Sequence, residues 1–210
     1  ISSVLILHLY YRNSATIDLL LKNYRNLQEK LSSINNLKEI NNSQDLLSYL
    51  FSLIYTKLDN KAKIKALLTE IYYYSINDRY TEAINLFNRS NLSQLVSMTK
   101  DNLTKVFYNR ALIQLGLCAF RKGEFEVAKY YFSPLCCLGS SRLRDNLCQT
   151  NEKSSNLDRE EKRKLIPFTM TINLEEVEAA FYISLLIDDI DKVLLQRLGK
   201  LKASIYLKKQ

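Results

Sequence analysis

Apolar residues recur at intervals of three or four along most of the chain, the spacing that places them on one face of an α-helix. Sheets need frequent turns, usually built with Gly, Pro, Asn or Asp, yet the 210 residues include only four glycines and two prolines. The pattern therefore predicts an all-α protein. The first predicted helices cover residues 16–31, about 43–54, 61–75 and 80–89. Ser43 is expected to cap the second of them, because its hydroxyl can accept a hydrogen bond from an otherwise unpaired backbone N–H.

A helix over residues 103–121 is predicted to be an inner one. Nearly every residue from Ala111 to Phe120 is apolar or small, with Gln114 the exception. A helix that is apolar all round is buried on more than one side, so it must lie between neighbouring helices. Gly123 is expected to end it, because glycine readily adopts the left-handed conformation common after a helix. A return helix is predicted over residues 124–135.

The chain changes character after Cys148. The stretch 151–164 is polar and charge-rich and has no apolar stripe, which predicts a flexible surface loop over residues 150–166. Asn173 is expected to cap the next helix, with Glu175 and Glu176 suited to the positive end of its dipole. A last helix follows, and it is expected to bury one face in the stack. Its stripe consists of Ile190, Val193, Leu194, Leu198, Leu201 and Ile205.

Two of the predicted helical hairpins resemble each other in sequence. Each has an aromatic residue, an alanine three positions later and a second aromatic four positions after that: Tyr80, Ala83 and Phe87 in the first, and Phe125, Ala128 and Phe132 in the second. The second hairpin also has Leu115-Gly116 upstream and Gly123 at its turn, which is the spacing of a tetratricopeptide repeat. One such match also fits an ordinary antiparallel helix pair, but the paired match favours a repeat.

The physical reason for this spacing is packing. Small residues let two helices approach closely, and the rings fill the gap to the next hairpin. We therefore predict a right-handed α-solenoid of degenerate hairpins, forming a single domain over residues 1–210. The residues predicted to hold the repeats together are Tyr80, Ala83, Phe87, Tyr108, Gly116, Phe120, Gly123, Ala128 and Phe132.

The sequence offers little catalytic chemistry. The only histidine, His8, lies in the apolar run Val4–Tyr11, so a core or partly buried imidazole is favoured over a catalytic base. The four cysteines form no CxxC pair, and no cluster has metal-ligand spacing. Neither GxxxxGK(S/T) nor GxGxxG, the phosphate-binding motifs, is present. The sequence therefore predicts a protein that is not an enzyme and has no cofactor, metal or small-molecule substrate.

The net charge of +8 favours acidic partners, but the basic residues are dispersed. Both weak RNA attraction and simple solubility remain open. The fourteen tyrosines admit base stacking too, although packing between helices is favoured. The basic last helix could lie on a membrane, but burial of its stripe in the stack is favoured. The candidate RNA contacts are Arg142, Arg144, Lys162, Arg163 and Lys164.

No signal peptide is recognisable, and the longest apolar run is far shorter than the roughly 20 residues that span a bilayer. We expect an intracellular protein without a membrane segment. The chain begins with Ile1, so it is read as a piece of a longer protein.

Two passages resemble the helical-repeat part of the c subunit of eukaryotic translation initiation factor three. Residues 108–123 read YNRALIQLGLCAFRKG and resemble the family's YNR-x-x-x-QLG-x-CAFR-x-G. Residues 166–178 read IPFTMTINLEEVE and are similar to its PFH-x-HINLELLE. Thr169 and Thr171 stand where the family usually has His, and Tyr80 stands where it often has Trp. These departures suggest a divergent lineage.

The resemblance implies a non-catalytic, cytoplasmic scaffold subunit that works in translation initiation. Its implied partners are the other subunits of initiation factor three and the small ribosomal subunit, which the factor binds. The family's PCI module is completed by a winged-helix segment, which residues 1–210 are not expected to include. The alternatives are a PCI-type scaffold subunit of the proteasome lid or the signalosome, and an RNA-binding helical-repeat protein.

Overall fold

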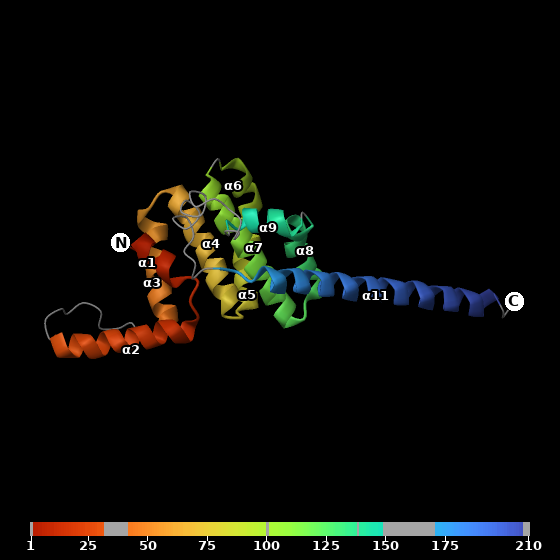
Figure 1. The fold of residues 1–210 in the computed structure, drawn as a ribbon, viewed down its shortest axis with the longest axis horizontal. Coiled ribbons are helices and arrows are strands. Elements are labelled where there is room, and N and C mark those ends of the chain that lie inside the picture. The colour runs from red at the N-terminus through yellow and green to blue at the C-terminus, as the bar shows by residue number, and fades with distance from the viewer. Residues whose placement is uncertain (1, 32–41, 100, 138, 149–170, 208–210) are drawn as a thin grey trace.

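Every element in the described part of the chain is an α-helix (Figure 1). The computed structural model describes residues 2–31, 42–99, 101–137, 139–148 and 171–207. The prediction of an all-α protein is confirmed for these residues. The flexible loop predicted at 150–166 lies outside them. The helices are α1 (Ser2–Leu9), α2 (Ser14–Leu31), α3 (Ser43–Lys57), α4 (Asn60–Ile76), α5 (Tyr80–Arg89), α6 (Leu92–Met98), α7 (Asn102–Lys122), α8 (Phe125–Cys136), α9 (Ser140–Asn146) and α11 (Leu174–Leu207).

The strongly periodic segments form helices close to where the sequence predicts them. Helices α4, α7 and α8 begin and end within one residue of the predicted bounds, and α5 matches them. Gly123 ends α7 in the left-handed conformation, with φ at 87°. Its N–H donates to the carbonyl of Phe120, and the N–H of Glu124 donates to that of Ala119. The predicted role of this glycine is confirmed.

The start of α3 differs from the prediction. Asn42 is the capping residue and makes no side-chain cap, while Ser43 is already helical and buried. The Ser43 N–H instead donates to Oδ1 of Asp18 in α2, at 2.7 Å. The cap therefore comes from a residue 25 positions earlier, which the local sequence around Ser43 does not indicate.

The C-terminal region also differs. The two helices expected there are one continuous helix, α11. Its predicted cap is confirmed, because the Glu175 N–H donates to Oδ1 of Asn173 at 3.1 Å. Its stripe is not buried as expected: Ile190, Val193 and Leu194 are 48, 49 and 52% exposed. For Leu198, Leu201 and Ile205 the structure describes the helical backbone and not the side chains.

Three short helices, α1, α6 and α9, were not predicted. Each has only seven or eight residues, too few for apolar periodicity to be recognised. His8 at the end of α1 is exposed, so the expectation of a buried or partly buried imidazole is wrong. The apolar run around it is instead split between the buried Ile6 and Tyr10 and exposed neighbours.

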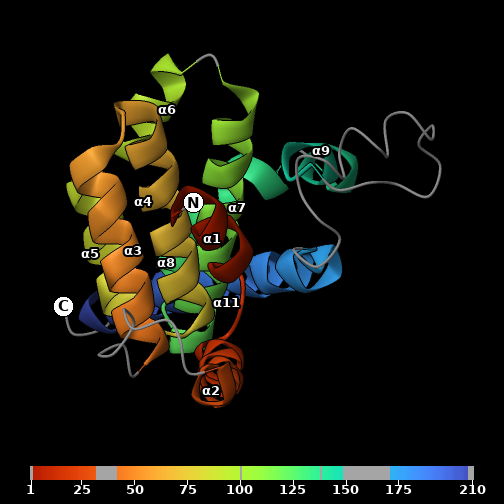
Figure 2. The same ribbon diagram turned by 90° about the vertical axis from the view of Figure 1, so that its left-hand side faces the viewer.

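Helix α7 is the centre of the packing, as predicted for an inner helix. It packs against α4 on one side and α8 on the other, in the order that Figure 1 shows from the side and Figure 2 views end-on, and it also touches α5, α6 and α11. Ile113, Leu115 and Ala119 have no exposed surface. The apolar character of α7 on all sides follows from this position between neighbours.

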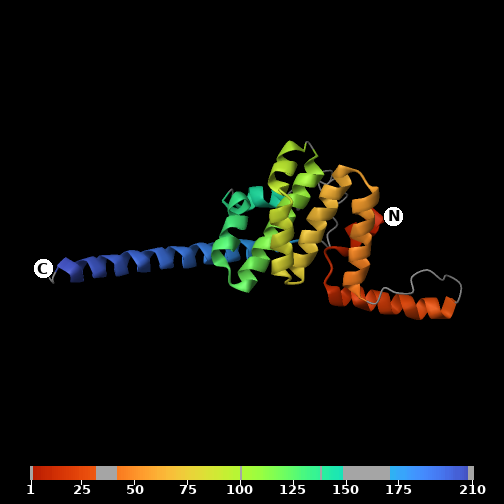
Figure 3. The same cartoon turned by 180° about the vertical axis from the view of Figure 1, so that it is seen from behind.

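The remaining helices extend this packing in both directions. Helices α1 and α3 pack against α4, and α11 packs against α8. The core is continuous from Ile6 and Tyr10 to Val177 and Phe181. Helices α2 and α11 project from opposite ends of the helical body (Figures 1 and 3). Among the described side chains of these two helices, those that contribute to the core belong to the first part of each helix.

Helices α7 and α8 approach each other closely at Gly116. A Cβ placed on Gly116 would stand 2.6 Å from Cε1 of Phe132, a separation that real Cβ atoms essentially never show. Phe132 itself has no exposed surface, so its ring has little room to move. Only glycine fits at position 116 without a shift of the ring.

We predict that Gly116→Ala lowers the free energy of unfolding by about 1–3 kcal/mol, because overpacking outweighs the roughly 1 kcal/mol that alanine gains over glycine in a helix. Gly116→Leu should be worse. The matched control is Gly199→Ala in α11, where a new Cβ meets nothing within 4 Å. Gly199→Ala should leave the free energy of unfolding unchanged or raise it. Urea unfolding followed by circular dichroism measures both, and equal stabilities for the two alanine variants would contradict the packing argument.

Candidate functional site

The turn between α4 and α5 joins four helices through polar contacts. It consists of Asn77, Asp78 and Arg79, and Asp78 has a positive φ of 56°. The Arg79 N–H donates to the carbonyl of Tyr74, which closes the end of α4. This geometry directs the three side chains toward different neighbours. We call these three residues the α4–α5 turn.

Asn77 connects the turn to α2. Its Oδ1 accepts from the Ser14 N–H at 2.9 Å, and its Nδ2 donates to the Tyr73 carbonyl at 2.9 Å. The first N–H groups of a helix have no partner within the helix, so this amide supplies one for α2. The position of α2 on the body is thus fixed by a residue 63 positions away.

Arg121 connects the turn to the end of α7. Its Nε donates to Oδ1 of Asp78 at 2.6 Å, and its Nη2 donates to the Ser75 carbonyl at 2.8 Å. A cation near the end of α4 also suits the negative end of the helix dipole. Both charged side chains are substantially exposed, so the ion pair fixes geometry more than it adds stability.

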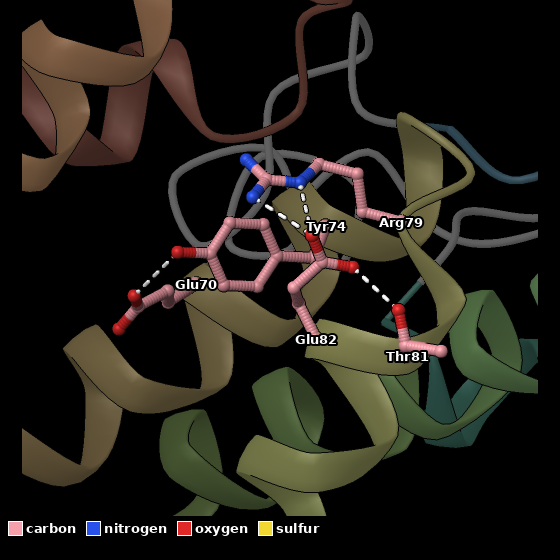
Figure 4. Close-up of polar contacts among 5 residues, drawn as sticks. All are labelled: Glu70, Tyr74, Arg79, Thr81 and Glu82. Atoms are coloured by element: carbon pink, nitrogen blue, oxygen red, sulfur yellow. Dashed lines mark hydrogen bonds and ion pairs between the residues drawn. The ribbon is translucent and has the colours of Figure 1, made fainter.

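A second polar network joins the same turn to α3 and α5, and Figure 4 shows its part from Glu70 to Glu82. Glu70 of α4 accepts from the hydroxyls of Tyr55 at 2.6 Å and Tyr74 at 3.0 Å. The guanidinium of Arg79 lies 4.8 Å from the centre of the Tyr74 ring and pairs with Glu82 at 2.9 Å. The network therefore runs unbroken from α3 to α5.

The pKa values of the two tyrosines follow from these surroundings. Burial, followed by the charge of Glu70, raises the pKa of Tyr74 to about 12. The same two causes raise the pKa of Tyr55 further. Both hydroxyls hence stay protonated as donors throughout the physiological range.

The segment Tyr108-Asn109-Arg110 holds the end of α9. Nδ2 of Asn109 donates to the Asn146 carbonyl at 3.1 Å, and Nη1 of Arg110 donates to the Leu147 carbonyl at 3.4 Å. The last carbonyls of a helix lack intrahelical partners, so these side chains satisfy two of them. The sequence could not indicate this role, because α9 itself was not predicted.

Arg110 also contacts an aromatic residue of α4. It has no exposed surface, and its guanidinium lies 5.9 Å from the centre of the Tyr72 ring in α4. Tyr72 in turn meets Tyr10 edge to face at 5.0 Å. Burial raises the pKa of Tyr10, while the charge of Arg110 acts against that rise. One buried cation thus contacts groups from α4 and α9 and influences Tyr10 beside α1.

The aromatic residues predicted to hold the repeats together lie in two different settings. Phe87 of α5 meets Tyr108 of α7 at 6.4 Å and Tyr131 of α8 at 5.5 Å, so it contacts both of these helices. Phe120 instead meets Phe125 across the turn of its own hairpin, at 5.5 Å. Phe132 likewise packs on Gly116 within its own hairpin.

The other predicted packing residues differ in burial. Ala83 and Ala128 have no exposed surface, and Gly116 is also buried. Gly123 is exposed at its turn. The residues that are only partly buried are Tyr80, Phe87, Tyr108 and Phe120.

An ion-pair cluster missed in the sequence attaches α11 to α8. Asp188 of α11 accepts from Lys129 of α8 and from Lys192, one turn later in α11, at 2.7 Å. Hydrogen bonds from Lys129 and Lys192 lower the pKa of the Asp188 carboxyl. The signal was weak in sequence, because acidic residues at 188, 189 and 191 resemble an ordinary solvated face.

The candidate RNA contacts are only partly described. Arg142 and Arg144 lie on the short helix α9, the first exposed and the second partly buried. Lys162, Arg163 and Lys164 lie outside the described residues.

A shallow hollow between α4 and the start of α7 is lined by Lys61, Ile64, Thr99, Asp101 and Thr104. The Asp101 carboxylate is already paired there, with Lys65 at 3.0 Å and Lys61 at 3.3 Å. Nowhere in the described ranges do three or more His, Cys, Asp or Glu side chains gather in an arrangement that could hold a metal ion. The same ranges contain no helix with the length and apolar character needed to cross a bilayer.

Comparison with known proteins gives one consistent result. Residues 1–193 match the family model described as the N-terminus of eukaryotic translation initiation factor 3 subunit 8. The chain belongs to this family. It is 30% identical to the C subunit of eukaryotic translation initiation factor 3 from Pyricularia oryzae over 181 residues, which cover 83% of this chain and 21% of that protein.

Two further relatives carry the same name. The protein of Yarrowia lipolytica is 34% identical over 69% of this chain, and that of Debaryomyces hansenii is 40% identical over 60% of it. The resemblance read from residues 108–123 and 166–178 is therefore confirmed. The matched part of the chain spans 15 to 21% of the length of these relatives.

The two motif passages that resemble the initiation-factor family have structural roles. The first contains the last two-thirds of α7, including Gly116 against Phe132 and Arg121 on the α4–α5 turn. The described end of the second carries the cap residue Asn173 and the buried Val177 at the start of α11. Both passages therefore hold helices together.

We predict that Asn77→Ala lowers the free energy of unfolding by about 1–2 kcal/mol, because it removes a helix cap and leaves the Tyr73 carbonyl without that donor. Amide exchange at the start of α2 should accelerate as well. Asn88→Ala, at an exposed position of α5, is the control and should change neither quantity measurably. Equal exchange rates in α2 for both variants would refute the role of Asn77.

We predict that stability falls as pH rises above about 10, the pKa of an unfolded tyrosine. The folded state keeps the Tyr74 proton up to about pH 12, so its contribution is complete below pH 10 and is lost between the two values. Tyr74→Phe should be about 1 kcal/mol less stable at neutral pH and lose less stability over that interval. The control is the exposed Tyr49→Phe. Denaturant unfolding at several pH values tests this, and parallel pH profiles for the wild type and Tyr74→Phe would contradict it.

Proposed function

We propose that this chain forms part of a non-catalytic scaffold subunit of initiation factor 3, in a cytoplasmic complex that binds the small ribosomal subunit. The observation that carries the proposal is the family match over residues 1–193. Relatives that share 30% identity over more than four-fifths of the chain are named as subunits of that factor. The scaffold would support assembly of the initiation complex by holding partners in a fixed geometry.

We infer that the fold is a right-handed solenoid of degenerate PCI-type hairpins, with residues 1–210 as one domain. Support comes from α4–α5 and α7–α8, which pack side by side through α7. Their equivalent residues Ala83 and Ala128 are both without exposed surface. The continuous core supports the assignment to one domain.

The use of the charged groups also supports a scaffold. Glu70 joins α3 to α4, Asp188 joins α11 to α8, and Arg121 joins α7 to the α4–α5 turn. Such contacts hold the angles between helices. A partner bound across several helices then meets a surface that is already in place, which lowers the ordering cost of binding.

The test is sedimentation of the tagged chain in a cell extract through a sucrose gradient. We expect it to migrate with small ribosomal subunits together with other subunits of initiation factor 3. Gly116→Leu should be lost from those fractions, whereas Gly199→Ala should remain. Failure of the folded chain to reach those fractions would refute the proposal.

A salt titration distinguishes the RNA-binding alternative, which the net charge of +8 favours. Direct phosphate contacts lose affinity steeply as salt rises, whereas binding through protein surfaces depends on it weakly. Substituting Arg142 and Arg144 by Gln should leave the sedimentation unchanged if the scaffold role is correct.

A further inference from the structure

Tyr73 of α4 is buried at the junction where α2, α3 and α4 meet. It is 2% exposed, and its hydroxyl makes no hydrogen bond to any residue in the described part of the chain. Buried hydroxyl groups in folded proteins almost always have a hydrogen-bond partner, because an unpaired one has given up its hydrogen bonds to water without replacement. The hydroxyl of Tyr73 therefore points to a bound molecule that supplies this hydrogen bond.

Two hydrogen bonds bring polar groups of α2 and α3 to the same junction. The Ser43 N–H at the start of α3 donates to Oδ1 of Asp18 in α2 at 2.7 Å. One helical turn after Tyr73, Asn77 accepts from the Ser14 N–H at 2.9 Å and donates to the Tyr73 carbonyl. Helix α2 therefore begins beside the start of α3 and the end of α4 (Figures 1 and 3).

The pKa of Tyr73 reflects the groups around its hydroxyl. Burial raises this pKa, a hydrogen bond from the Ser43 side chain lowers it, the charge of Asp18 raises it and that of Arg79 lowers it. Hydrogen-bonding effects act only at short range, so Ser43 lies near the hydroxyl. Ser43 is itself 2% exposed, so both side chains are removed from bulk solvent. The Tyr73 hydroxyl thus lies among polar groups from α2 and α3.

The chemistry of these groups suits a water molecule better than an ion. The Tyr73 hydroxyl can donate, the second carboxylate oxygen of Asp18 can accept, and the Ser43 hydroxyl can do either. A buried water typically makes about three hydrogen bonds, which agrees with this set. The Asp18 carboxylate would repel an anion. A divalent cation would find one carboxylate as ligand and would be repelled by the charge of Arg79.

We propose that an ordered water molecule binds between Tyr73, Ser43 and Asp18 and joins α4 to α3 and α2. The water accepts a hydrogen bond from the Tyr73 hydroxyl and donates to the Asp18 carboxylate and the Ser43 hydroxyl. It adds a water-mediated link to the two direct hydrogen bonds that hold the start of α2. The inference concerns the chain itself and does not depend on the proposed function.

A crystal structure of the chain, at a resolution that shows ordered water, tests the proposal directly. Density for a water should lie about 2.8 Å from the Tyr73 hydroxyl oxygen and within hydrogen-bond distance of Asp18 and Ser43. A direct hydrogen bond from the Tyr73 hydroxyl to a protein group, with no density between them, would overturn the proposal. A Tyr73 hydroxyl that contacts neither water nor protein would overturn it as well.

The variant Tyr73→Phe gives an independent measurement, because the sign of its effect depends on whether the hydroxyl has a partner. Removing a hydroxyl that binds a water should raise the equilibrium constant of unfolding about fivefold, as the loss of one hydrogen bond does. An unchanged or lowered constant would contradict the proposal. The control is Tyr49→Phe, at a position that is 53% exposed, which should change the constant about twofold or less. Urea unfolding measures both variants.

A double-variant cycle with Asp18→Ala tests whether the water extends to α2. The loss of the Asp18 bond to the Ser43 N–H appears in the single and the double variant alike, so it cancels in the cycle. Tyr73→Phe should therefore raise the unfolding constant less in the Asp18→Ala background than in the wild type. Independent effects of the two substitutions would refute the bridge between Tyr73 and Asp18.

Discussion

The contact between Gly116 and Phe132 sets the distance between α7 and α8, and the neighbouring contacts depend on that distance. Helix α8 presents Tyr131 to Phe87 of α5 and Lys129 to Asp188 of α11. If a larger side chain pushed α8 away from α7, both contacts would lengthen together. A single position without a side chain therefore governs how α5, α7, α8 and α11 fit. Protein interiors are close-packed, so the neighbouring side chains have no free volume that could accommodate such a displacement.

Polar side chains determine the remaining geometry by satisfying the ends of helices from a distance. Asp18 serves the start of α3, Asn77 the start of α2 and Arg121 the end of α4. Asn109 serves the end of α9 in the same way. Each bond joins a helix end to a residue on a different helix. Helices connected in this manner keep their mutual angles, which is what a scaffold requires.

The sequence was informative where the signal is local. Apolar periodicity gave α4, α5, α7 and α8 closely, and Gly123 marked its turn correctly. It was uninformative where the partner is distant, as for the cap on Ser43 or the pairing of Asp188. A stripe of apolar residues also cannot show whether a neighbour covers it. For that reason the exposure of Ile190 was not foreseen.

Helices α7 and α11 show the two outcomes of one sequence property. Both carry apolar residues on more than one side, and in α7 neighbouring helices cover those sides. In α11 the described side chains are covered on the face toward α7, α8 and α9 and exposed on the opposite side. Apolar surface left in water contributes nothing to folding of the chain, whereas apolar surface buried in the core contributes about 25 cal/mol per Å². The same pattern that stabilises the core at Ile113 thus adds nothing at Ile190, where no described helix covers the side chain.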